Sequence, residues 1–163
     1  MSNALVLRSR QKVRNLDLRF LRRIVIHCLE ELFRITKYEL GVQFVDAEEM
    51  TRLNECYLRH RGSTDVITFN YSQGAIRNPQ SAIHGDVVIC INEAIIQAKR
   101  FGTRWPEEVV RYTVHGILHL AGHDDRTEKQ WQAMKEIENR IMRELSARFA
   151  VHTLSRPRNP KNG

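Results

Sequence analysis

Residues 115–125 read HGILHLAGHDD, and this stretch decides how the rest of the chain is interpreted. His115 and His119 are four residues apart, so on a helix their rings project from one face and can hold one metal ion. Gly122 follows where such a helix would end, because glycine adopts the left-handed conformation without a steric penalty. The stretch therefore predicts a helix that carries two metal ligands and ends in a sharp turn.

The third ligand has to come from the residues after that turn. If the helix continued, His123 would lie about 12 Å along the axis from His115, too far for bonds of roughly 2 Å to one zinc ion. The turn at Gly122 brings the chain back, and the spacing of the motif favours Asp125, since a carboxylate is an acceptable zinc ligand. His123 is the alternative third ligand, and Asp124 could orient a ligand histidine. We predict one Zn²⁺ ion, although the donor set also suits other divalent transition metals.

The chemistry of the predicted site depends on the residue after the first histidine. Zinc proteases with an H-E-x-x-H helix carry a glutamate there as general base, whereas this chain has Gly116. Three protein ligands leave zinc an open position, which predicts hydrolysis. Phosphodiester hydrolysis needs cations around the phosphoryl group, and Arg59 is the residue that we predict for a phosphate contact. Asp65 and Asp86 are further candidates for a base or for a residue that orients a ligand, although carboxylates at such positions commonly stabilise turns. His84 is a candidate for proton transfer.

Residues 115–125 also resemble the metal motif of the YbeY endoribonucleases, a family of bacterial rRNA maturation factors. The resemblance includes Leu53-Asn54 with Tyr57, the segment TDVITF at 64–69 and the segment GDVVI at 85–89. These blocks occur in the family's order and at similar spacing, over roughly residues 45 to 145. Many members have a third histidine at the position of Asp125, and an arginine at the position of Leu58.

The resemblance implies a zinc-dependent, single-strand-specific endoribonuclease that acts in maturation of the small-subunit rRNA 3′ end and in ribosome quality control. The implied partners are single-stranded or ribosomal RNA and the small ribosomal subunit. The residues leave two alternatives open. One is a non-catalytic RNA- or ribosome-binding assembly factor with a structural zinc ion, and the other is a metallopeptidase-like hydrolase whose base comes from elsewhere.

Length and composition predict one soluble domain in the cytoplasm. The 163 residues contain no apolar run long enough to span a membrane and begin without the apolar stretch of a signal peptide. Three cysteines, an odd number without C-x-x-C spacing, predict reduced thiols rather than disulfides. The net charge of +7 is concentrated in the first 23 residues and after Glu144, and such clusters attract phosphate backbones.

Hydrophobic periodicity predicts an α+β fold, in which a small mixed sheet of about four strands packs against several helices and the zinc site lies at the end of a central helix. We expect a single domain over residues 1–151 and a disordered basic tail over 152–163. The expected strands are 4–8, 42–45, 66–70 and 87–91. The expected helices are 18–33, 46–53, 93–100, one that begins near Pro106, and one that is capped by Thr127 and Gln130 and buries the stripe Trp131, Met134, Ile137, Ile141 and Leu145.

Overall fold

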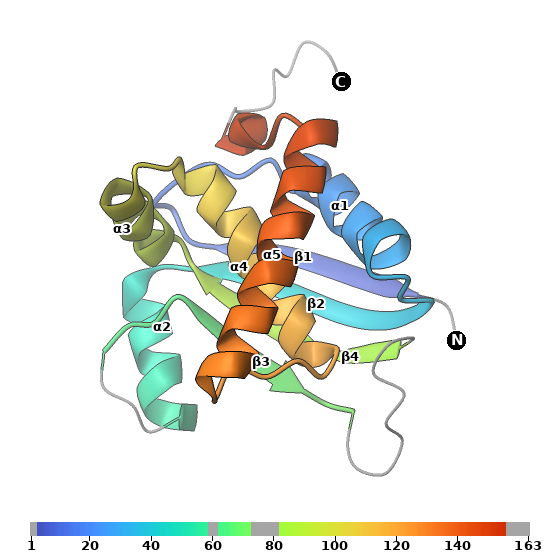
Figure 1. Ribbon diagram of the computed structural model, residues 1–163. Helices are drawn as coiled ribbons and strands as arrows, with labels where there is room; N and C mark the ends of the chain where they lie inside the picture. Colours follow the sequence, from blue (N-terminus) through green and yellow to red (C-terminus); the bar gives the residue numbers. More distant parts are fainter. Residues whose placement is uncertain (1–2, 59–61, 73–81, 156–163) are drawn as a thin grey trace.

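One four-stranded sheet organises the computed structural model, which describes residues 3–58, 62–72 and 82–155 (Figure 1). The strand order is β1-β2-β4-β3, with β1 Ala4–Arg10, β2 Lys37–Val45, β3 Val66–Asn70 and β4 Ala82–Cys90. β1 and β4 both run parallel to β2, whereas β3 runs antiparallel to β4. The sheet is therefore mixed, and β4 is an inner strand, as its continuous apolar run predicted.

Five α-helices accompany the sheet in the described part of the chain: α1 Leu18–His27, α2 Ala47–Leu53, α3 Ile91–Phe101, α4 Trp105–Leu120 and α5 Glu128–Arg148. π-Helical segments extend α1 over Cys28–Leu32 and α2 over Asn54–Leu58. This arrangement confirms the predicted α+β class. None of the helices in the described ranges combines the length and the apolar character that crossing a bilayer requires.

Side-chain caps set where several helices begin. The carboxylate of Asp46 accepts a hydrogen bond from the backbone N–H of Glu49 at the start of α2. At the start of α5, Thr127 and Gln130 form a reciprocal capping box, in which each side chain accepts from the other residue's backbone N–H. Both caps were predicted, because cap signals are local in sequence.

The helices cover the two faces of the sheet unequally. On one face α4 packs against β4 and β3, and α5 packs on the outer side of α4 (Figure 1). Val87 and Ile89 of β4 point into this large core. On the other face a smaller cluster joins Val88 and Cys90 to Met50 of α2. The central helix α4 therefore lies between the sheet and α5, and it is the element that carries the histidine pair.

The end of the chain and the stripe of α5 differ in part from the expectations. A 3₁₀ helix spans Val151–Ser155 and buries Leu154, so the expected boundary at residue 151 falls inside it, and residues 156–163 lie outside the described ranges. The prediction that Trp131 belongs to the buried stripe of α5 is wrong, since its side chain is 51% exposed. Glu138 is instead buried on that face, at 3% exposure.

Candidate metal centre

Two histidines on α4 form the base of the candidate centre. His115 and His119 are one turn apart, and their Nε2 atoms approach to 3.1 Å. Most neighbouring positions of α4 are buried, which fixes the rotation of the helix and turns both rings toward the same side. The two side chains are 29% and 24% exposed, so a substrate can reach them.

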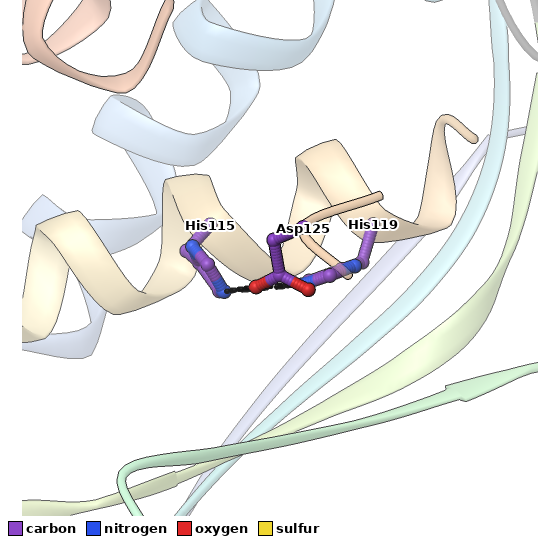
Figure 2. A group of neighbouring side chains, drawn as sticks. All are labelled: His115, His119 and Asp125. Carbon is purple, nitrogen blue, oxygen red and sulfur yellow. Dashed lines mark hydrogen bonds and ion pairs between the residues drawn. The ribbon is translucent and has the colours of Figure 1, made fainter. Parts of the chain in front are cut away.

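The helix end after His119 brings the third donor back. Gly122 has φ 98°, and its N–H donates to the carbonyl of His119, while the N–H of His123 donates to the carbonyl of Leu118. These two bonds form a Schellman motif, which needs a left-handed residue at the position of Gly122. The chain then reverses, and the carboxylate of Asp125 faces both histidine rings (Figure 2).

The spacing of the three donors suits a tetrahedral metal ion. The Oδ2 atom of Asp125 lies 3.4 Å from Nε2 of His119 and 3.7 Å from Nε2 of His115. Ligand bonds of 2.0–2.2 Å in a tetrahedral site separate two ligand atoms by about 3.4 Å. These three residues therefore form a group that could hold one ion, and His123 lies outside the group that the described residues form.

A buried carboxylate fixes the ring of His115. Nδ1 of His115 lies 3.0 Å from Oε2 of Glu138, whose other oxygen accepts from Arg111 at 2.9 Å. Burial alone would raise the pKa of Glu138, but the hydrogen bonds with His115 and Arg111 outweigh it, so the pKa is lowered. An ionised carboxylate can only accept, so Nδ1 carries the proton and Nε2 is directed at the candidate metal position.

Glu138 is the site residue that the sequence interpretation missed. The orienting role was considered for Asp124, which instead accepts from the backbone N–H of Asp125 and pairs with Arg126. A signal was present, since Glu138 lies four residues after Met134 and three before Ile141, in the middle of the buried face of α5. A carboxylate at such a position requires a buried partner.

Gly116 has a packing role in this fold. A Cβ atom at this position would lie 2.5 Å from Cγ1 and 2.8 Å from Cγ2 of Val87 on β4. A side chain at position 116 would therefore run into Val87 of the sheet. The glycine permits close approach of α4 to β4, in addition to lacking the carboxylate of a protease base.

The remaining predicted residues fall into three places. Asp65 lines a groove together with His115. His84 and Asp86 lie on the other face of the sheet, where His84 is 3.2 Å from Glu39 and Asp86 accepts from the hydroxyl of Tyr71. The structure does not bring these two residues to the histidine pair. Arg59 lies outside the described residues.

The chain is similar to known proteins over most of its length. The family model described as Endoribonuclease YbeY matches residues 6–146. Endoribonuclease YbeY of Elusimicrobium minutum is 37% identical over 110 residues, which are 68% of this chain and 76% of that protein. The protein of the same description from Syntrophus aciditrophicus is 32% identical over 143 residues, which are 86% and 89% of the two chains. A solution structure from Thermotoga maritima, 22% identical, shares the fold with a TM-score of 0.66 and covers 96% of this chain and 98% of its own. The resemblance of the metal motif is thus confirmed, and the chain belongs to the Endoribonuclease YbeY family.

Proposed function

We propose that this chain is a zinc-dependent endoribonuclease that cuts single-stranded RNA, with His115, His119 and Asp125 as the metal ligands. The observation that carries the proposal is the triangle of three donors, 3.1 to 3.7 Å apart, at the end of α4. Membership of the endoribonuclease family supports RNA as the substrate. The proposed biological role is maturation of the small-subunit rRNA 3′ end and ribosome quality control, in the cytoplasm and in contact with the small ribosomal subunit.

Each residue of the proposed site has a separate role. A bound divalent metal ion supplies Lewis-acid chemistry at a phosphoryl oxygen. His115 and His119 would hold the ion through Nε2, and Glu138, by accepting from Nδ1 of His115, selects the tautomer of the neutral ring in which Nε2 carries the lone pair. The carboxylate of Asp125 contributes a negative charge that neutral histidine would not. Arg59 is proposed to contact the RNA phosphate, where its guanidinium offsets developing charge.

Zinc is proposed over other metals from the donor set. Two imidazoles and one carboxylate in a group that fits tetrahedral spacing suit Zn²⁺, whereas Mg²⁺ prefers six oxygen ligands. Metal analysis of the purified protein after exposure to equal concentrations of Zn²⁺, Mn²⁺ and Mg²⁺ tests this. Recovery of Mn²⁺ or Mg²⁺ in preference to Zn²⁺ would reject zinc.

The decisive experiment measures cleavage of a labelled single-stranded RNA and bound metal together. We expect His119→Ala and Asp125→Ala to lose both, and His123→Ala to keep both, because His123 lies outside the donor group. Loss of metal in His123→Ala but not in Asp125→Ala would identify His123 as the third ligand. Arg59→Ala should keep the metal and lose most cleavage.

The same experiment separates the alternatives. A protein that binds RNA and zinc but never cuts would be an assembly factor with a structural metal. Chelator-sensitive cleavage of an unfolded peptide, without cleavage of RNA, would indicate a metallopeptidase-like hydrolase. The position of Gly116 argues against the peptidase, since glycine has no carboxylate and a side chain there would meet Val87. Mapping of small-subunit rRNA 3′ ends in cells that carry only His119→Ala tests the biological role.

A further inference from the structure

A groove of about 340 Å³ begins at the candidate metal centre and follows α4. Its walls come from α3, α4 and α5, and Asp65, just before β3, also lines it. From His115 back to Glu108 the groove covers two turns of α4, or about 10 Å at the rise of an α-helix. The groove therefore reaches from the reacting centre to a region that the proposed metal chemistry does not use.

Two aromatic side chains on the groove wall are unusually exposed. Phe101, the last residue of α3, is 66% exposed, and Trp131, in the first turns of α5, is 51% exposed. Large aromatic rings of a folded domain are usually mostly buried, so two on one groove indicate a binding role. Planar aromatic rings are the side chains on which unpaired nucleobases stack.

The charges of the groove favour a base over a phosphate. Asp65 and Glu108 contribute carboxylates to the wall, and negative charge repels a phosphate. The two cationic side chains among the described lining residues, Arg111 and Lys135, both contact Glu138, at 2.9 and 3.5 Å. A nucleobase carries no charge, and the exocyclic amino groups of adenine, guanine and cytosine donate to acceptors such as carboxylates.

Tyr112 provides a separate observation on the same groove. Its side chain is 6% exposed and lines the groove, and its buried hydroxyl has no hydrogen-bond partner among the described residues. Buried polar groups almost always have a partner, so the unpaired hydroxyl of this wall residue can still accept or donate a hydrogen bond where the groove wall adjusts to a ligand. Burial raises the pKa of Tyr112, which keeps the hydroxyl neutral and able to donate.

We propose that this groove is the nucleobase subsite of the endoribonuclease, in which the base beside the scissile phosphate leaves its stack and packs against Phe101 and Trp131. The inference rests on the proposed function for its substrate. Its consequence is a physical reason for single-strand selectivity, because a paired base cannot enter the groove without breaking its pair.

Nucleotide binding without catalysis is the first test. In Trp105→Phe protein, Trp131 is the single tryptophan, since the chain has two. Titration with adenosine monophosphate should quench its fluorescence saturably, whereas ribose 5-phosphate, which has the phosphate but no base, should not. Equal quenching by both compounds, or none by either at millimolar concentration, would overturn the proposal.

Kinetics on single-stranded RNA is the second test. Loss of a stacking ring should raise KM about tenfold in Phe101→Ala and in Trp131→Ala, with bound metal unchanged. Trp131→Phe keeps an aromatic ring and should raise KM less than Trp131→Ala does. Ile96→Ala is the matched control, because Ile96 is an exposed apolar residue of α3 that does not line the groove.

The outcomes distinguish failure of the base subsite from failure of the proposed endoribonuclease function. Wild-type cleavage with unchanged KM in both alanine variants would reject the base subsite and leave the proposed function standing. Failure of the wild type to cut any RNA would reject the proposed function, and the adenosine monophosphate titration would then still decide whether the groove binds a base.

Discussion

The buried carboxylate of Glu138 is the residue on which the candidate centre depends most after its ligands. It lies 3.0 Å from Nδ1 of His115 and is held from the other side by Arg111. A carboxylate in this position orients a ligand histidine and raises its basicity toward a metal. The contact joins α5 to α4, so one side chain links the packing of two helices to the electronic properties of the site.

Glu138→Gln should weaken zinc binding about 10- to 100-fold, because the neutral amide keeps the volume of the side chain but removes its charge. Competition with a chromogenic chelator measures the affinity, and urea denaturation checks that the fold persists. Glu136→Gln is the control, since Glu136 is exposed on the same helix. An affinity within twofold of wild type would show that Glu138 does not tune His115.

The pKa shift of His115 predicts how the stability of the metal-free protein depends on pH. Burial lowers the pKa of His115, but the hydrogen bond and charge of Glu138 outweigh it and raise the pKa above 6.5. The folded protein therefore binds this proton more tightly than the unfolded chain. The resulting stabilisation is fully present below about pH 6.5 and is lost as the pH rises through the raised pKa.

Urea denaturation in the presence of a chelator, at pH values on both sides of 6.5, measures this dependence. The free energy of unfolding of the wild type should decline across that range. His115→Gln should lose that part of the decline, because glutamine does not titrate. If the free energy of unfolding had the same slope against pH in the wild type and in His115→Gln, the decline could not be assigned to His115.

At the scale of elements, the contact between α4 and β4 determines where the histidines point. Gly116 faces Val87, and a Cβ at position 116 would lie 2.5 Å from a methyl group of that residue. Gly116→Ala should therefore destabilise the fold by about 1–3 kcal/mol, as overpacking does. The sign of this change in stability is informative, because alanine in a helix interior is normally more stable than glycine by about 0.5–1 kcal/mol.

A double-mutant cycle with Val87→Ala tests this interpretation of the contact. Val87→Ala removes the two methyl groups, so the double variant should lose less stability than the sum of the two single variants. The free energy of unfolding from urea denaturation is the quantity to compare. Additive losses, or a stabilised Gly116→Ala, would mean that α4 and β4 are not in close contact at this position.

The elements that could be predicted from sequence were those with local signals. The caps of α2 and α5, the glycine turn after α4 and the strand at 66–70 all follow from residues a few positions apart. β2 was predicted only over 42–45, although it begins at Lys37, because Gly41 interrupts its alternation. In the sheet Gly41 lies opposite Asp86, whose carboxylate occupies the space of the missing Cβ.

What could not be predicted depends on contacts between distant segments. The pairing of His115 with Glu138 spans 23 residues and forms only when α5 packs on α4. The same packing turns Trp131 outward, although its spacing from Met134 fits a buried stripe. Periodicity identifies the faces of a helix, but the partner helix decides which edge of an apolar face remains open.

At the scale of the whole molecule, the candidate centre joins the central helix, the connection that follows it and α5. His115 and His119 lie on the central helix, Asp125 lies in the connection to α5, and Glu138 extends the network into α5 itself. These groups come from separate segments of the chain, and only folding brings them together. A metal ion that binds them should therefore stabilise the entire domain, because the unfolded chain offers no equivalent site.

Zinc removal should accordingly lower the thermal stability of the wild type. With free zinc at 100 times its dissociation constant, linkage adds about 2.7 kcal/mol to the free energy of unfolding. For a chain of 163 residues that corresponds to a rise in Tm of roughly 5 to 10 °C. Calorimetry with and without a chelator measures the shift, and Asp125→Ala should show little of it, since one of the three ligands is missing. A shift of equal size in Asp125→Ala would mean that the stabilising zinc binds elsewhere, because the closed triangle of donors at the end of α4 is the reason to expect this coupling.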